Sequence, residues 1–82
     1  MIILIADHDD KELHRVEELV KKRYADAELI TVRSSLKALA AARKKTVDIA
    51  FLSADMPELS GLDLGKYLIE LRSEERRVGK RV

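Results

Sequence analysis

Two short clusters hold the side chains of this chain that could do chemistry. The first runs from Asp7 to Asp10 and includes His8, and the second runs from Ser53 to Asp55. Carboxylates are ligands for hard cations such as Mg²⁺, imidazoles suit transition metals, and a hydroxyl or a carboxylate can accept a phosphoryl group. The two clusters can form one site only if the fold brings them together.

Each cluster follows an apolar run that is typical of a β-strand. Ile2 to Ile5 is continuous and mostly β-branched, and the apolar run stops at Asp7, which predicts a strand buried on both faces of a parallel sheet. Asp48 to Ser53 is again mostly apolar and predicts a second such strand. A third strand is predicted over Glu28 to Val32, which is short and rich in β-branched residues.

Helical patterns follow the strands. Asp9 or Asp10 can cap a first helix, Ser34 or Ser35 can cap a second over Leu36 to Lys45, and Ser60 can cap a third. The first helix has a one-sided apolar stripe at Leu13, Val16, Leu19, Val20 and Tyr24, and the third has one at Leu64, Tyr67, Leu68 and Leu71.

The resulting order is strand-helix repeated three times, which predicts an α/β fold with parallel strands and right-handed crossovers. Ligands of such sheets bind at the carboxyl ends of the strands. Both chemical clusters are therefore expected at the same edge of the sheet.

The composition limits the class of protein. The chain has 82 residues, of which 46% are hydrophobic and 38% charged, so it can form one small globular domain. A net charge of +1 gives no general attraction to nucleic acid or to a membrane. The absence of cysteine excludes disulfides and thiolate metal sites. Because Met1 to Ala6 is too short to span a membrane, we expect a soluble, cytoplasmic protein.

The segment from Arg72 to Val82 differs from the rest of the chain, because it loses the apolar stripe and becomes almost purely charged. It could be a frayed basic end of the third helix. Arg72 to Lys80, however, resembles the translation of a common sequencing-adapter read. We therefore interpret residues 72–82 as a non-native charged tail.

Residues 1–71 resemble the first three βα units of a response-regulator receiver domain of bacterial two-component signalling, in the CheY-like superfamily. The resemblance is carried by ILIADHDD (Ile3 to Asp10) and by DIAFLSADMPELSGLDL (Asp48 to Leu64). It implies a partial flavodoxin-like receiver fold of three parallel strands alternating with three helices. A complete receiver domain has five strands, so the resemblance also implies truncation after the third βα unit.

The same resemblance assigns roles to individual residues. Ser53 stands at the phosphoacceptor position, four residues before Pro57, where the family has aspartate. Asp7 and His8 stand where the family has two acids of the Mg²⁺ pocket, and Asp55 stands where the family supplies a backbone carbonyl to the metal. With serine and histidine in place of two acids, we expect Mg²⁺ binding to be weak or absent.

These assignments predict a degenerate receiver that is not an enzyme and acts through protein contacts, with a sensor histidine kinase or another signalling protein as partner. The resemblance implies nucleic-acid binding only through an effector domain that the 82 residues do not contain. One alternative is an active receiver phosphorylated on Asp55 or Asp7. Another is a small metal-binding α/β protein that uses His8, His14 and the neighbouring acids.

Overall fold

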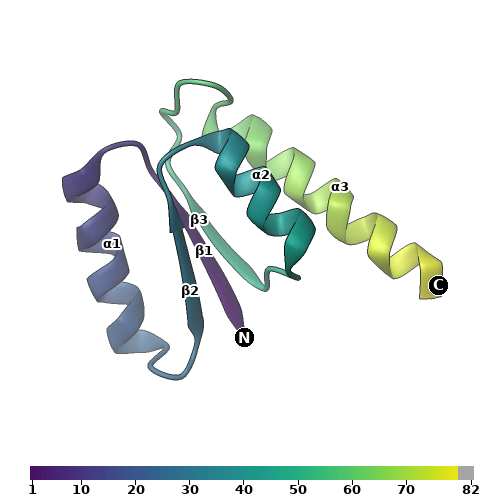
Figure 1. Cartoon of the computed structure of the whole chain (residues 1–82), viewed down its shortest axis with the longest axis horizontal. Coiled ribbons are helices and arrows are strands. Elements are labelled where there is room, and N and C mark those ends of the chain that lie inside the picture. The colour runs from purple at the N-terminus through teal and green to yellow at the C-terminus, as the bar shows by residue number, and fades with distance from the viewer. Residues whose placement is uncertain (80–82) are drawn as a thin grey trace.

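The computed structural model describes the backbone of residues 1–79 and the side chains of residues 1–71. Strands and helices alternate along the chain, as predicted (Figure 1). They are β1 (Ile2–Ala6), α1 (Asp10–Arg23), β2 (Glu28–Val32), α2 (Ser35–Lys44), β3 (Ile49–Leu52) and α3 (Gly61–Gly79).

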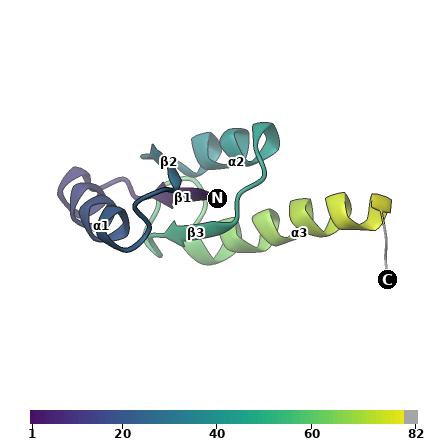
Figure 2. The same cartoon turned by 90° about the horizontal axis from the view of Figure 1, so that it is seen from below.

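The three strands form one parallel sheet in the order β2-β1-β3. The register pairs Leu4 of β1 with Ile30 of β2 and with Ala50 of β3. Figure 2 shows α1 on one side of the sheet and α2 and α3 on the other. The central position of β1 explains why its sequence is apolar without alternation.

Two cores lie on the two faces of β1. Leu4 and Ala6 pack with Ala38, Met56 and Leu64 beneath α2 and α3. On the opposite face, Ile3 and Ile5 pack with Leu13 and Val20 of α1. Full burial of an aliphatic side chain of this size contributes roughly 1.5–3 kcal/mol, so β1 supplies much of the stabilisation of both layers.

Each helix begins directly after a residue that the sequence proposed as a cap. Asp9 caps α1 and accepts a hydrogen bond from the Lys11 N–H at 3.0 Å. Ser34 caps α2 by accepting from the Lys37 N–H at 3.1 Å, so Ser35 is the first helical residue rather than the cap. At α3, the Ser60 hydroxyl accepts from the N–H of Asp63 at 3.2 Å.

Two members of the predicted apolar stripes do not belong to the core. Leu19 is 54% exposed and Tyr67 is 50% exposed. Each lies at the margin of an arc whose centre faces the sheet, and the three-stranded sheet is too narrow to cover that margin. The predicted burial of these two side chains is therefore wrong.

α3 extends beyond the apolar stripe and continues to Gly79. The interpretation of residues 72–82 as a non-native tail stays a prediction, and residues 80–82 lie outside the described residues. Among the helices that the structure describes, none combines the length and hydropathy of a membrane span.

Candidate functional site

The two chemical clusters meet at the carboxyl edge of the sheet, as predicted. The Ser53 N–H donates to the carbonyl of Ala6 at 2.9 Å, so the residue after β3 lies beside the end of β1. A cavity of about 320 Å³ opens here between α1, β1 and β3. It is lined by Asp7, Glu12 and Ser53 together with Ile5, Ala6, Val16, Phe51 and Leu52.

Asp7 is the most buried acid of the site, with 7% of its surface exposed. Its N–H donates to the Val32 carbonyl at 3.1 Å, and its Oδ1 accepts from the N–H of Asp9 at 3.0 Å. A carboxylate held in this way has a fixed direction and retains lone pairs toward the cavity. Asp7 can therefore act as a preorganised anionic ligand.

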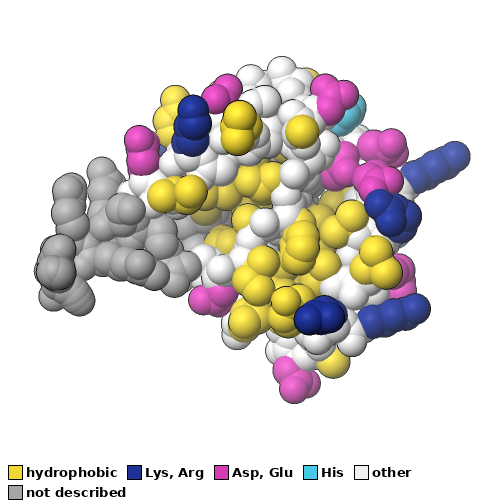
Figure 3. All heavy atoms as spheres, turned by 180° about the vertical axis from the view of Figure 1, so that it is seen from behind, with side chains coloured by type: hydrophobic (Ala, Val, Ile, Leu, Met, Phe, Trp, Pro, Cys, Tyr) yellow, Lys and Arg dark blue, Asp and Glu magenta, His cyan; other side chains and the backbone are white. Residues whose placement is uncertain are grey.

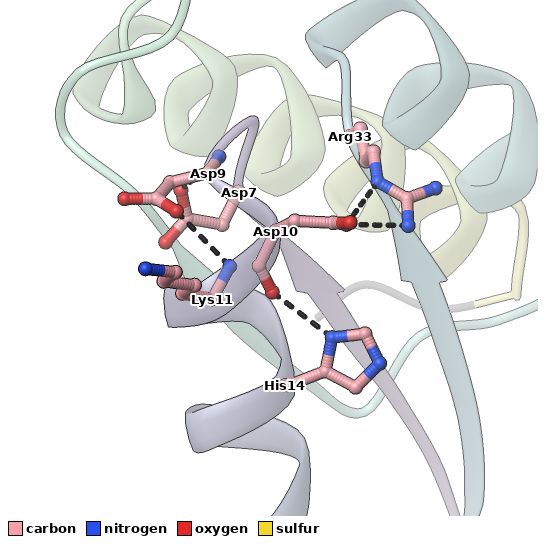
Figure 4. A network of polar contacts seen from close by, with 6 residues as sticks. All are labelled: Asp7, Asp9, Asp10, Lys11, His14 and Arg33. Atoms are coloured by element: carbon pink, nitrogen blue, oxygen red, sulfur yellow. Dashed lines mark hydrogen bonds and ion pairs between the residues drawn. The ribbon is translucent and has the colours of Figure 1, made fainter.

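The next two aspartates have structural roles (Figure 4). Asp9 is the cap of α1, as predicted. Asp10 forms an ion pair with Arg33, whose Nε and a terminal guanidinium nitrogen each lie 2.5 Å from Asp10 Oδ1. Both partners are mostly exposed, so this pair contributes little to stability. Its effect is to join the end of β2 to the start of α1.

The two histidines do not converge with the acids. His8 is exposed, and His14 is exposed with its Nδ1 3.0 Å from the carbonyl oxygen of Asp10. Among the described residues, no three histidine, cysteine, aspartate or glutamate side chains are grouped so that they could hold a metal ion. The set Asp7, His8 and Asp55 therefore does not form a three-residue metal cluster in this structure.

Ser53 is half-buried at the wall of the cavity. Its hydroxyl oxygen accepts a hydrogen bond from the N–H of Asp55 at 3.3 Å. This contact turns the chain sharply after β3 and places the exposed Asp55 two residues beyond the cavity wall. A neutral hydroxyl and the Asp7 carboxylate thus line the same cavity.

Glu12 is a member of the site that the sequence analysis missed. It lies in the first turn of α1 and lines the same cavity as Asp7 and Ser53. A hydrogen bond from the Arg15 guanidinium lowers the pKa of Glu12, and the same contact raises the pKa of Arg15. The Glu12 carboxylate adds negative charge to the cavity wall, and its ion pair with Arg15 offsets part of that charge. The signal in the sequence is its position one turn into the helix that begins at the carboxyl edge.

Gly61 allows α3 to begin close to Ser53. A Cβ atom at position 61 would lie 2.1 Å from the carbonyl oxygen of Ser53 and 2.7 Å from its carbonyl carbon. No described residue has a positive φ, so glycine is required here by close packing and not by a left-handed turn.

Ser35 links the loop between β3 and α3 to α2 through hydrogen bonds. Its side chain is fully buried, and its hydroxyl donates to the Leu59 carbonyl at 2.7 Å and accepts from the Leu59 N–H at 3.3 Å. The Ser35 N–H donates to Glu58 Oε1 at 3.2 Å. The sequence offered Ser35 only as a possible cap, whereas its partners lie 23 and 24 residues away.

Comparison with solved structures identifies the fold. A CheY-like response regulator receiver domain from Methylobacillus flagellatus matches with a TM-score of 0.73 and 26% identity, covering 84% of this chain and 57% of that one. The chemotaxis protein CheY4 of Vibrio cholerae matches with a TM-score of 0.75 and 22% identity, covering 87% of this chain and 57% of that one. The chain thus has a partial CheY-like, flavodoxin-type fold.

One curated protein also matches the chain in sequence. Stress response regulator protein 1 of Debaryomyces hansenii is 30% identical over 76 residues, which are 93% of this chain and 31% of that protein. The chain therefore spans about a third of the length of this relative and somewhat more than half of the solved structures. No protein-family model matches the chain.

Proposed function

We propose that residues 1–71 are the N-terminal part of a response-regulator receiver domain of two-component signal transduction, and that its phosphoacceptor position is degenerate. The observation that carries the proposal is the shared cavity of Asp7 and Ser53 at the carboxyl edge of the sheet. The similarity to receiver domains in fold and sequence supports the same assignment.

The chemistry of residue 53 decides what the cavity can do. In receiver domains, an aspartate carboxylate attacks the phosphorus of a phosphohistidine and forms a labile acyl phosphate. Ser53 could form only a phosphate ester, which is far more stable and would not turn over as a switch. The Ser53 hydroxyl also accepts a hydrogen bond from a backbone N–H, which does not activate it as a nucleophile. We therefore propose that the domain acts through protein contacts without a phosphorylation cycle.

The side chains fit Mg²⁺ poorly. The cation prefers several oxygen ligands, and of the two acids expected from the family only Asp7 is retained. His8 is exposed and carries an imidazole, which is a poor ligand for a hard cation. Glu12 adds negative charge to the cavity but is engaged by Arg15. We propose that Mg²⁺ binding is weak or absent.

The third part of the proposal concerns the extent of the domain. The matched receiver structures are longer than this chain, which covers 57% of each. We propose that a complete domain continues past Leu71 with a further βαβα half, and that residues 72–82 are a non-native tail. Partners of the complete protein would be a sensor histidine kinase or another signalling protein.

Labelling with a small phosphodonor tests the proposed degeneracy. The chain is incubated with the donor and Mg²⁺, treated with hydroxylamine and examined by mass spectrometry. We expect no hydroxylamine-sensitive adduct, because Ser53 cannot form an acyl phosphate. A labile adduct on Asp7 or Asp55 would contradict the proposal and favour an active receiver that uses a neighbouring acid.

A double variant restores the two missing acids and gives the positive control. His8→Asp with Ser53→Asp should bind Mg²⁺ more tightly than the unchanged chain in a calorimetric titration. The matched control, His14→Asp with Thr31→Asp, adds the same charge outside the cavity and should leave Mg²⁺ binding unchanged. Equal binding by the unchanged chain and the His8, Ser53 double variant would show that the pocket is wrongly assigned.

A further inference from the structure

The loop between β3 and α3 is closed on itself. At its start, the Ser53 N–H donates to the Ala6 carbonyl at 2.9 Å. At its end, the Gly61 N–H donates to the Ala54 carbonyl at 3.2 Å, so the two ends of the loop meet. Met56, in the middle of the loop, is 7% exposed and packs in the core beneath α2 and α3. A compact loop whose ends meet and whose own side chains fill it holds a defined shape.

α2 contacts the second half of this loop at two places. The Ser35 hydroxyl bonds both the N–H and the carbonyl of Leu59. The other contact involves a charge, because the Glu58 carboxylate accepts a hydrogen bond from the Ser35 N–H at 3.2 Å. Ser35 lies in the first turn of α2, where backbone N–H groups have no partner within the helix. We call the contacts of Ser35 with Glu58 and Leu59 the α2 latch.

Glu58 supplies a charge that α2 lacks in its own sequence. Acidic residues stabilise the first turn of a helix, because its free N–H groups form the positive end of the helix dipole. α1 has Asp10 and Glu12 in its first turn, whereas the first turn of α2 has no acidic residue and its cap, Ser34, is neutral. Glu58 therefore completes the start of a helix that begins 23 residues earlier in the chain.

The α2 latch lies apart from the site cavity. The described residues that line the cavity belong to β1, α1 and β3 or directly follow a strand, as Asp7 and Ser53 do. α2 lies toward the viewer in Figure 1, whereas Figure 3 shows the molecule from behind, where hydrophobic side chains gather in a hollow. The cavity reaches the loop through the hydrogen bond from the Asp55 N–H to the Ser53 hydroxyl, which lies before the α2 latch in the chain.

We propose that the α2 latch holds residues 56–59 in one position whatever the charge or occupancy of the Asp7 and Ser53 cavity. A change at residue 53 displaces Ala54 and Asp55 through the contact of Ser53 with Asp55. The displacement stops at Met56 and the α2 latch, because their partners lie in the core and in α2.

This inference rests on the proposed function in one respect, since it treats the cavity of Asp7 and Ser53 as the site whose state would otherwise move the loop. It adds a structural reason for signalling without a phosphorylation cycle. The surface that α2 and the loop offer to a partner protein stays constant, because the α2 latch is formed by residues of the chain itself and needs neither phosphate nor metal.

Hydrogen exchange measured by NMR tests the role of Glu58. Glu58→Ala removes the acceptor of the Ser35 N–H, so the Ser35 amide should exchange roughly tenfold faster and the Leu59 amide should follow it. Glu58→Gln retains a neutral acceptor and should have a smaller effect. The matched control is Glu18→Ala, at an exposed position of α1, which should change neither amide. Unchanged exchange of Ser35 and Leu59 in Glu58→Ala would overturn the inference.

A mutant cycle tests whether the α2 latch isolates the loop from the cavity. Ser53→Asp adds a charge to the cavity wall and removes the hydroxyl that accepts from Asp55. With the latch intact, it should change exchange of the Leu59 amide by less than about twofold, as for independent sites. In a chain that also carries Ser35→Ala and Glu58→Ala, it should change that exchange by about fivefold or more, as for coupled sites.

The amides of β1 report unfolding of the whole chain in each variant. If they lose protection when both latch residues are replaced, the same cycle is measured with Glu58→Ala alone. An effect of Ser53→Asp on Leu59 that is equal with and without the latch, whether large or small, would overturn the inference. A labile acyl phosphate on Asp7 or Asp55 would instead contradict the proposed function, and it would leave these exchange rates of the unlabelled chain as they are.

Discussion

At the scale of single residues, the two glycines near the start of α3 have opposite roles. Gly61 lies so close to the Ser53 carbonyl that a Cβ atom there would overlap with backbone. A Cβ atom at position 65, one turn later, would lie 3.7 Å from the Leu52 Cδ1 atom, which is an ordinary contact distance. The same substitution should therefore have opposite effects at the two positions.

Gly61→Ala should lower the free energy of unfolding by about 1–3 kcal/mol, because the Cβ atom forces α3 away from the end of β3. Gly65→Ala should raise it by roughly 0.5–1 kcal/mol, because alanine favours the helix and has room. Urea denaturation of the two variants beside the unchanged chain measures both effects. Equal effects at the two positions would contradict the close approach at Gly61.

The residues of the cavity show why a sequence pattern does not by itself define a site. Asp7 and Ser53 come from segments that a parallel sheet must bring together. Glu12 joins them because the first turn of α1 lies at the same cavity. It forms an ion pair with Arg15, three residues along the same helix.

At the scale of elements, α2 and the β3–α3 loop are joined by the hydroxyl of Ser35. The preceding residue, Ser34, has the same side chain but caps α2 at an accessible position. Comparing these two serines therefore distinguishes a contact between elements, made by Ser35, from a contact within one helix, made by Ser34.

Ser35→Ala should lower the free energy of unfolding by about 1–3 kcal/mol, because it leaves the partly buried N–H and carbonyl of Leu59 without this partner. Ser34→Ala should cost about 1 kcal/mol through loss of the cap. Hydrogen exchange of the Leu59 amide distinguishes the two variants. The Leu59 amide should exchange faster in Ser35→Ala but not in Ser34→Ala, and unchanged exchange of Leu59 in both variants would show that the Ser35 contact does not hold the loop.

At the scale of the whole molecule, the sheet is covered unevenly. α2 and α3 cover one face, whereas α1 alone covers the other (Figure 2). Several large apolar side chains remain exposed, among them Phe51, Ile69 and Leu62. Half-exposing such side chains forfeits on the order of 1 kcal/mol each, which is a substantial part of the roughly 5–15 kcal/mol that stabilises a typical domain.

Extending the chain past Leu71 with the βαβα half of a receiver domain should therefore raise its stability and give cooperative melting. In the extended chain, the amides of Ala50 and Leu52, which alternate with those bonded to β1, should be protected from exchange by the added strand. In the 82-residue chain they should exchange faster. An extension that merely lengthens the charged segment 72–82 is the control and should not raise the melting temperature.

The sequence by itself determined the order of elements and the place of the candidate site. The period of the apolar residues separates strands from helices, and the caps at Asp9, Ser34 and Ser60 locate the helix starts to within a residue. Strict alternation then implies parallel strands, whose carboxyl ends share one edge, so Asp7 and Ser53 were predicted to meet. Each of these inferences depends on neighbours within about one or two helical turns.

Only the tertiary structure decided the contacts between residues far apart in sequence. The pairing of Arg33 with Asp10, the fastening of Leu59 by Ser35 and the approach of Gly61 to Ser53 all depend on the relative positions of elements. Local periodicity states which face of an element is apolar but not which residue it meets across the fold. For the same reason, the place of Glu12 beside Asp7 and Ser53 became specific only when the sheet and its covering helices were seen together.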